Sequence, residues 1–261
     1  MKLRFNRHRH AAVHVFVGIV LLSGIVLDSQ PLYGQYKKWS VTASVGLNRL
    51  NLAAVDNKNS SDVAGWANQG IPVADFASVK ISPLYSVGVR YRSDREFALS
   101  LTGTYWNKTV SSSYDGSDAI LHLDRGVGST DLMFGVSYYP GAQPPQFEWY
   151  IQGNIDLTMA RATAKAVGSV GQKPGGTMIL VPFIDTDGKY KKSSLSAGLG
   201  VGADMRLGGA FSLTGYAGYR FAQLGTMEGD ISRFGVQTTE SSTTAFDFSG
   251  LQISAGIRYD L

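Results

Sequence analysis

The sequence contains no cysteine, few charged residues and, beyond its first 34 positions, no long hydrophobic run. Without cysteine the chain has no disulfide, no thiolate catalysis and no lipid-modified N-terminal cysteine. Charged residues make up 17% of the chain, below the roughly 25–35% that suits a soluble surface. A membrane helix needs about 18 or more consecutive apolar residues. If this chain crosses a membrane, it therefore does so with strands.

The N-terminus is typical of an export signal. Four basic residues within Met1–His10 precede an apolar run from Ala11 to Leu27, which is the order of regions in a signal peptide. We predict a signal peptide at residues 1–34, cleaved near Gly34, and one mature domain at residues 35–261. The alternative is an uncleaved anchor helix.

Removal of the signal changes the charge of the chain. The whole sequence has a formal net charge of +4, and residues 1–34 carry four of its 24 basic and one of its 20 acidic residues, which leaves the mature chain at +1. A nucleic-acid partner is not expected, because such a partner requires a basic surface. Three of the four histidines also lie in the signal, so His122 alone belongs to the mature chain.

The mature chain repeats a pattern of period two, in which apolar residues alternate with small or polar ones, as in a strand with two different faces. Eight segments have this pattern: Trp39–Asn48, Lys80–Arg92, Phe97–Trp106, Asp131–Tyr138, Phe147–Met159, Leu195–Arg206, Phe211–Phe221 and Leu251–Leu261. The links between them alternate long and short. The long ones, predicted as loops, are about 53–79, 111–126, 160–192 and 223–244.

The two faces of these segments predict which side points outward. The polar face is mainly Ser, Thr and Gly and lacks the charge of a soluble surface, so we place it inside, where Gly198, Gly200 and Gly202 suit a narrow lumen. The apolar face then meets lipid. Because unpaired backbone groups are costly in lipid, the sheet must close by pairing the Trp39 strand with the Leu251 strand.

Aromatic residues gather at the short-link end of the apolar face. Such belts are typical of a headgroup boundary. The residues are Trp39, Tyr91, Phe97, Tyr138, Phe147, Trp149, Phe211 and Tyr259, with Tyr105 and Phe221 in a weaker belt at the other end.

With its signal, eight alternating segments, unequal links and terminal Tyr259 and Leu261, the sequence resembles the OmpA-type eight-stranded outer-membrane barrel family. The resemblance covers about 39–261. It implies an all-β fold, a closed antiparallel up-and-down transmembrane barrel with short periplasmic turns and long extracellular loops. It also implies that the last strand is recognised by the barrel assembly machinery. The peptidoglycan-binding domain that follows many such barrels is not expected here.

Charged residues on the inward face are candidates for either a pore or a plug. Both signs are present, and buried charges require partners, so a plug of ion pairs is favoured over a gated pore. The residues are Lys80, Arg90, Arg92, Asp131, Glu148, Asp156, Asp204, Arg206, Arg220, Arg258 and Asp260.

His122 raises the possibility of an enzyme, since some small outer-membrane barrels are lipid-modifying hydrolases with a His, Ser and acid set near the outer rim. Asp124, Ser129 and Asp131 offer the neighbouring groups. A nucleophile needs a positioned base and an orienting group, however, and Ser is common throughout this chain. No catalytic, cofactor-binding or metal-binding residue is therefore assigned.

The long loops are the other place for function. Asp185–Gly188 lacks the further ligands of a calcium loop and is predicted to be a turn, and 171–177 lacks the lysine of a phosphate loop. Apolar residues in the loops could contact a partner or pack the loops together. They are Trp66, Ile71, Phe76, Met178, Ile179, Val181, Phe183 and Phe234.

These observations predict an integral protein of the outer membrane of a diderm bacterium, exported through the inner membrane. We expect a structural or binding role in the cell envelope, with loops presented outside. The expected partners are outer-membrane lipid and lipopolysaccharide, the assembly machinery and an extracellular partner of the loops. The alternatives are a narrow porin-like channel and an outer-rim hydrolase.

Overall fold

A computed structural model describes residues 39–261 apart from 142, 145 and 173–178. The predicted signal peptide at residues 1–34 lies outside the described residues, as do Met178 and most of 171–177. No helix in the described part of the chain has both the length and the apolar character needed to cross a membrane.

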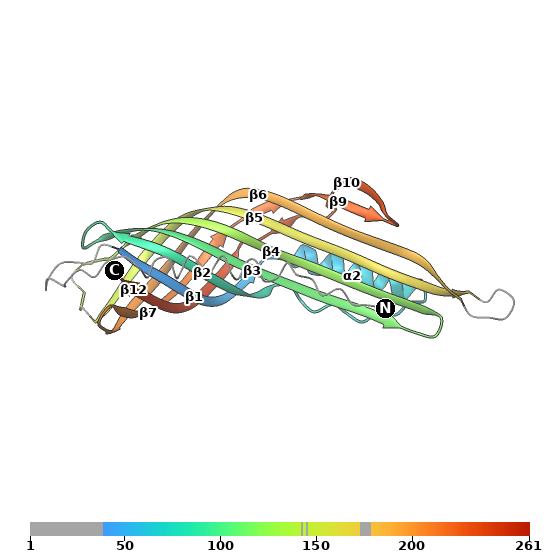
Figure 1. The fold of residues 1–261 in the computed structure, drawn as a ribbon, viewed down its shortest axis with the longest axis horizontal. Coiled ribbons are helices and arrows are strands. Elements are labelled where there is room, and N and C mark those ends of the chain that lie inside the picture. Colours follow the sequence, from blue (N-terminus) through green and yellow to red (C-terminus); the bar gives the residue numbers. More distant parts are fainter. Residues whose placement is uncertain (1–38, 142, 145, 173–178) are drawn as a thin grey trace. The chain divides into compact units, whose positions relative to one another are not determined.

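Eight antiparallel strands of the described chain form a closed ring (Figure 1). In ring order each pairs with the next, and β7 pairs with both β12 and β6. They are β1 (Trp39–Leu50), β2 (Ile81–Arg92), β3 (Phe97–Asp115), β4 (Ala119–Tyr138), β5 (Phe147–Gln172), β6 (Ile179–Gly208), β7 (Phe211–Phe221) and β12 (Gly250–Asp260). All eight predicted segments are strands, and the predicted closure is confirmed, with Val45 opposite Ala255.

Two of the predicted loops are instead strand. β3 and β4 continue together as far as Asp115 and Ala119, and β5 and β6 remain paired out to Gln172 and Ile179. The turn predicted at Asp185–Gly188 is wrong, because those residues lie inside β6 opposite β5. We call the part of β3–β6 beyond the ends of the neighbouring ring strands the extension.

The last long link also contains strands that were not predicted. β9 (Glu228–Arg233) pairs with β6, and β10 (Val236–Ser241) pairs with β9. β8 (Gln223–Gly225) and β11 (Phe246–Asp247) form a separate short pair. The β9–β10 hairpin therefore widens the extension alongside β6 (Figure 1).

The polarity of the two faces reverses where the ring meets the extension. On β5 the outward residues are apolar up to Met159 and are then Arg161, Thr163 and Lys165. The inward residues are polar up to Thr158 and are then alanine at 160, 162, 164 and 166. Since the period of two is unbroken, the strand is continuous while its surroundings change.

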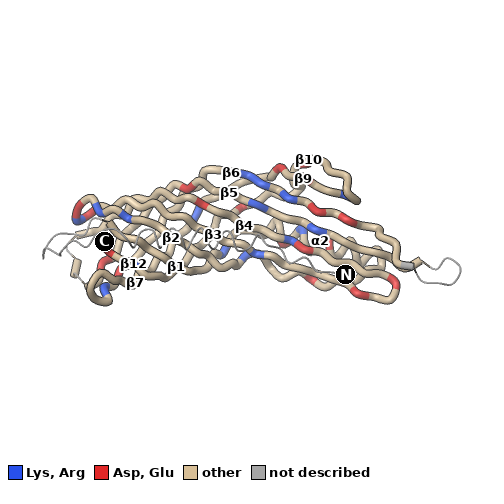
Figure 2. Tube along the Cα trace, in the orientation of Figure 1, with Lys and Arg blue, Asp and Glu red and all other residues tan. Residues whose placement is uncertain are grey.

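Neighbouring strands reverse at corresponding positions. On β3 the outward apolar run ends at Tyr105, and the inward face becomes apolar at Trp106. On β6 the outward residues change from Leu195 to Ser193 and Lys191. Figure 2 shows both acidic and basic residues along the strands on the side of the molecule where α2, β9 and β10 lie. The extension thus has the polar exterior and apolar interior of a water-exposed sheet.

The first long link contains a helix, α2 (Ala53–Asn68), where a loop was predicted. Leu52, Val55 and the following Val79 are buried in one apolar cluster, and Trp66 contacts the Phe183 ring at 5.8 Å. Asp56 fixes the helix to the start of β2, because it accepts hydrogen bonds from Ser78 Oγ and the Val79 amide. α2 therefore lines the inside of the extension (Figure 1).

The aromatic residues predicted to form the main belt lie on the outward face at the short-link end. Seven of the eight are exposed, and Tyr91 is half-buried. They pair across neighbouring strands, with ring centroids 4.9 Å apart for Trp39 and Tyr91 and 5.0 Å apart for Phe211 and Tyr259. At the opposite boundary Tyr105 is covered by the Arg161 guanidinium at 5.2 Å. The predicted direction of the two faces is confirmed.

Candidate functional site

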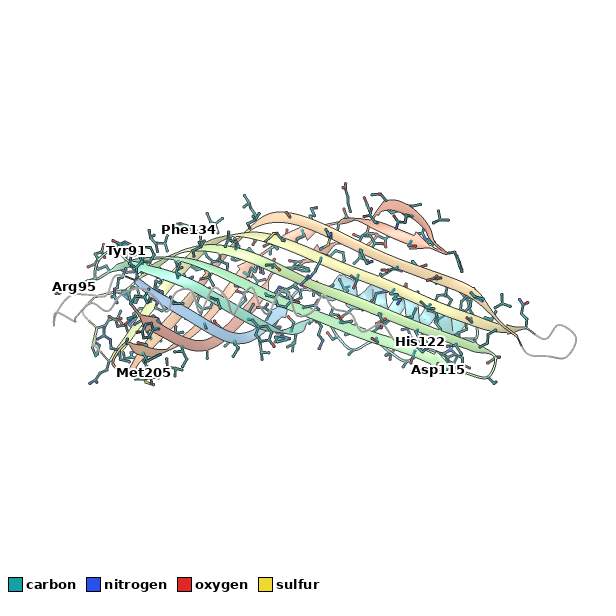
Figure 3. All side chains as sticks on the ribbon, in the orientation of Figure 1. Tyr91, Arg95, Asp115, His122, Phe134 and Met205 are labelled. Carbon is teal, nitrogen blue, oxygen red and sulfur yellow. The ribbon has the colours of Figure 1, made fainter. Side chains whose placement is uncertain are left out.

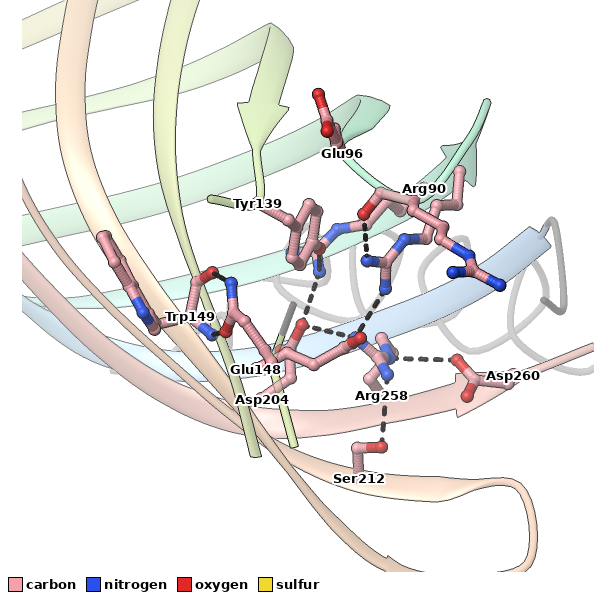
Figure 4. A network of polar contacts seen from close by, with 12 residues as sticks. Arg90, Glu96, Tyr139, Glu148, Trp149, Asp204, Ser212, Arg258 and Asp260 are labelled. Carbon is pink, nitrogen blue, oxygen red and sulfur yellow. Dashed lines mark hydrogen bonds and ion pairs between the residues drawn. The ribbon is translucent and has the colours of Figure 1, made fainter. Parts of the chain in front are cut away.

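The interior of the ring holds two clusters of buried charge. The first, which we call the Asp204 network, lies near the short-link end (Figure 4). Arg90 Nη1 donates to Asp204 Oδ2 at 2.8 Å, and Arg258 Nη1 donates to the same oxygen. Arg90 also donates to the hydroxyls of Tyr139 at 2.8 Å and Tyr150 at 3.0 Å. Strands from opposite sides of the ring are thereby joined across its interior.

Further ion pairs surround this network. Arg92 Nη1 lies 2.8 Å from Glu148 Oε2, and Arg258 Nε lies 3.0 Å from Asp260 Oδ1. With Arg90 and Asp204, three arginines meet three carboxylates. The charges are matched in number, as is expected for charge removed from water.

The second cluster, the Arg220 network, lies further along the ring. Arg220 makes a two-pronged contact with Asp131, with distances of 2.8 and 2.7 Å, and its Nε lies 3.9 Å from Asp156 Oδ2. Thr104 and Ser129 hydroxyls donate to Asp131, each at 3.0 Å. Arg220 and Asp131 are 2% and 1% exposed, so this guanidinium is held by planar, charge-assisted hydrogen bonds away from solvent.

Between these groups lies a cavity of about 80 Å³ whose wall is mostly Ser, Thr and Gly, with Arg90, Tyr150 and Tyr216 among the larger residues. Beyond the Arg220 network the interior is apolar. Trp106 packs edge-on against Phe248 with ring centroids 5.0 Å apart, in a cluster that also contains Leu50, Leu84 and Met227. Apart from this cavity, two ionic clusters and an apolar cap occupy the interior, and this supports the predicted plug.

Two of the predicted inward charges lie elsewhere. Lys80 precedes β2 and is exposed, with its Nζ 3.6 Å from Asp56 of α2. Arg206 is exposed because the β6–β7 register shifts between Arg206 and Gly208. Tyr139 was not predicted as a partner. It follows the end of β4, where the alternation that marks inward residues has stopped.

The four residues considered for a hydrolase are not brought together. His122 is exposed on the outward face of β4, with Nε2 3.4 Å from Asp115 near the β3–β4 turn (Figure 3). Ser129 and Asp131 point inward, because they differ from His122 by an odd number of residues along one strand. Asp124 instead accepts a hydrogen bond from Ser111 Oγ at 2.6 Å. No group of three or more potential metal ligands occurs in the described residues.

Most apolar loop residues pack the extension together. Ile71 is buried with Leu121 and Leu123, and Trp66, Phe76 and Phe183 pack against that cluster. Val181 is half-buried, and the side chain of Ile179 lies outside the described residues. Phe234 differs, since it is 58% exposed at the β9–β10 turn with φ 49°.

The β9–β10 hairpin is closed by an exposed ion pair. Arg233 Nη1 and Nη2 donate to the two carboxylate oxygens of Glu240 at 2.6 and 3.0 Å. The hydrogen bonds from Arg233, together with one from Thr238, lower the pKa of Glu240. The hydrogen bonds to Glu240 and its negative charge raise the pKa of Arg233. This exposed ion pair, which we call the clamp, lies beside the exposed Phe234.

No protein-family model matches this chain, and no curated protein matches its sequence. Among solved structures, a major outer membrane protein from Thermus thermophilus is similar with a TM-score of 0.51 and 13% identity, over 86% of this chain and 99% of that one. Neisserial surface protein A has a TM-score of 0.42, 11% identity and coverage of 87% and 98%. OprG from Pseudomonas aeruginosa has a TM-score of 0.42 and 9% identity, over 86% of this chain and 96% of that one. The chain therefore has the fold of an outer-membrane β-barrel, as its resemblance to OmpA-type barrels implied.

Proposed function

We propose that this chain is an integral outer-membrane β-barrel of a diderm bacterium, exported through the inner membrane, with a structural or binding role in the envelope. The short links between β2 and β3, β4 and β5, and β6 and β7 face the periplasm. The extension faces the outside. Outer-membrane lipid surrounds the ring, and the assembly machinery recognises the last strand, which carries Tyr259.

The observation that carries this proposal is the reversal of polarity along the strands. On β3 the outward apolar run covers Phe97–Tyr105, and on β6 it covers Leu195–Met205. Runs of these lengths match the roughly 9–11 residues that a tilted strand needs to cross the hydrocarbon core. A soluble barrel keeps the same polarity along each strand, whereas a barrel emerging from lipid into water must reverse it.

The exposed aromatic side chains support the same boundaries. Trp39, Phe97 and Tyr259 lie at one end of the apolar band, and Tyr105 with Arg161 lies at the other. Aromatic rings are favoured at headgroup depth because one part of the ring is apolar while another is polar. The cation over Tyr105 can reach the headgroup layer while its aliphatic stem stays along the strand.

The filled interior supports a structural or binding role over conduction. Arg220 and Asp131 occupy the lumen, and Trp106 and Phe248 seal it with apolar groups. In planar bilayers we expect no conductance steps from the purified protein. Regular steps would point instead to a channel, which requires these clusters to open.

Cysteine labelling tests the topology cleanly, because the natural chain has no cysteine. We expect Lys165→Cys, outward on the extension, to react with a membrane-impermeant maleimide on intact cells. Ser93→Cys, in the β2–β3 link, should react only after the outer membrane is permeabilised. Ile155→Cys, in the apolar band, should react in neither case until the protein is denatured.

The outcome also separates the proposal from its rivals. If Ser93→Cys reacts on intact cells and Lys165→Cys does not, the orientation is reversed. If all three react equally in the soluble fraction, and boiling does not change the mobility of the protein on a gel, the chain is not a membrane barrel.

A further inference from the structure

A second interior space lies within the extension, apart from the charged lumen. This pocket of about 340 Å³ is lined by residues of α2, β4, β5 and β6 and by residues 242–246. Its size falls within the roughly 300–1,000 Å³ typical of small-molecule sites. It is about four times as large as the cavity between the ionic networks.

The space exists because one strand carries small inward side chains. Ala162, Ala164 and Ala166 of β5 form one wall, whereas inward residues elsewhere on the ring include tyrosine, glutamine and arginine. Leu123 and Phe246 extend the apolar surface. The pocket therefore offers an apolar wall suited to the body of a ligand.

Asn59 of α2 supplies a polar group without a partner. The residue is 3% exposed and lines the pocket, and its Nδ2 has no hydrogen-bond partner among the described residues. A buried amide donor without an acceptor is unfavourable. A ligand oxygen in the pocket would satisfy it once the Asn59 side chain turns toward the pocket.

Three charged side chains line the pocket: those of Lys58 and Asp62 on α2 and that of Arg125 on β4. Asp62 lies between two cations, with Oδ1 2.5 Å from Lys58 Nζ and Oδ2 3.2 Å from Arg125 Nη2. The group therefore has one positive charge in excess. Lys58 is 48% exposed at its side chain, so the charged end of the pocket is the end that meets solvent.

We propose that this pocket binds a small monocarboxylate with an apolar body. The carboxylate accepts hydrogen bonds from Asn59 Nδ2 and offsets the excess charge of Lys58 and Arg125. The apolar body lies along the alanine wall of β5. The excess positive charge and the apolar surface of this single pocket select this class over neutral polar or strongly basic molecules.

The test is titration calorimetry of the purified full-length protein in detergent with 4-phenylbutyrate, a soluble carboxylate with an apolar body. The matched amide, 4-phenylbutyramide, and phenyl phosphate serve as comparison ligands. We expect the carboxylate to bind at least about ten-fold more tightly than the amide, because it adds charge-assisted hydrogen bonds. Tighter binding of phenyl phosphate would overturn the assignment to a monocarboxylate.

Two variants and one control locate the binding. Ala162→Phe fills the apolar wall, and Asn59→Leu removes the donor while keeping a similar size; each should weaken binding at least about ten-fold. Lys165→Phe lies on the same strand but points outward, and it should bind like the natural protein. Heat-dependent gel mobility verifies that each variant folds. If Ala162→Phe does not fold, the binding measured with Asn59→Leu tests the location of the site. No binding by the natural protein, equal binding of acid and amide, or unchanged binding by Asn59→Leu would each overturn the proposal.

Discussion

The ring of Tyr150 on β5 occupies the space left by the missing side chain of Gly202 on the adjacent strand β6. The two residues are register partners on β5 and β6, and a Cβ at Gly202 would overlap Tyr150 Cζ. The Tyr150 hydroxyl in turn accepts a hydrogen bond from Arg90. We expect Gly202→Ala to displace the ring and disturb the Asp204 network, with a loss of about 1–3 kcal/mol in the free energy of unfolding.

Gly153→Ala is the matched control for this substitution. Gly153 lies on β5, paired on both sides within the ring, but a Cβ there would meet no atom within 4 Å. Urea titration in detergent, followed by tryptophan fluorescence, measures both variants. Equal stability of the two variants would show that Tyr150 moves aside without cost.

Leu199→Arg tests the lipid-facing side of the ring. Leu199 is 58% exposed near the middle of the apolar run of β6, so a charge there should cost about 2–4 kcal/mol of folding free energy in a bilayer. Ser193→Arg, outward on the same strand beyond the reversal of polarity, should change little. Folding titrations in lipid vesicles measure both. A neutral Leu199→Arg would mean that the apolar face does not meet lipid.

The ring could be predicted because the alternation within each strand distinguishes its apolar face from its polar face. Val41, Ala43 and Val45 alternate with small polar residues, and one such segment fixes both the strand and the side that turns inward. Closure followed from the cost of unpaired backbone in lipid. The extension was not predicted, because beyond Met159 the period of two persists with the faces exchanged: Arg161 and Lys165 point outward, and small alanines point inward.

A weaker pattern in the sequence indicates the helix α2. Leu52, Val55, Asn59, Val63 and Trp66 follow one another at intervals of three and four, as one face of a helix does. The Asn in that row and the polar residues around it hid the pattern. The β9–β10 hairpin has no comparable row, since most of β10 is exposed and its pairing depends on β6 having extended first.

For the interior, the sequence identifies the charges but not their partners. That Asp131, Asp156 and Arg220 point inward follows from parity along β4, β5 and β7. That Arg220 reaches Asp131 across the ring depends on strand stagger, which no single strand encodes. The hydrolase hypothesis for His122 fails on the same parity, because Ser129 and Asp131 lie on the opposite face.

Asp131→Ala should destabilise the ring strongly. It removes the two-pronged acceptor of Arg220 and leaves a buried guanidinium with the Thr158 hydroxyl and, as its nearest charged partner, the Asp156 carboxylate 3.9 Å from Nε. Breaking a buried pair from one side costs about 3–5 kcal/mol. Asp124→Ala, on the outward face of the same strand, should change stability by no more than about 0.5 kcal/mol. Urea titration that finds the two variants alike would contradict a stabilising role for the Arg220 network.

The clamp on the β9–β10 hairpin should weaken in acid. The hydrogen bonds from Arg233 and Thr238 lower the pKa of Glu240, so the carboxylate stabilises the folded hairpin at a pH above its unfolded pKa of about 4.3. That contribution is lost as the pH falls through the lower folded pKa. In carbon-detected NMR of the labelled protein we expect the Glu240 carboxyl to titrate below that of an ordinary glutamate, and Arg233→Met to return it to the ordinary range. Hydrogen exchange at the β9 and β10 amides, corrected for intrinsic rates, should quicken on acidification in the natural protein and not in Glu240→Gln; an ordinary Glu240 titration would exclude the clamp.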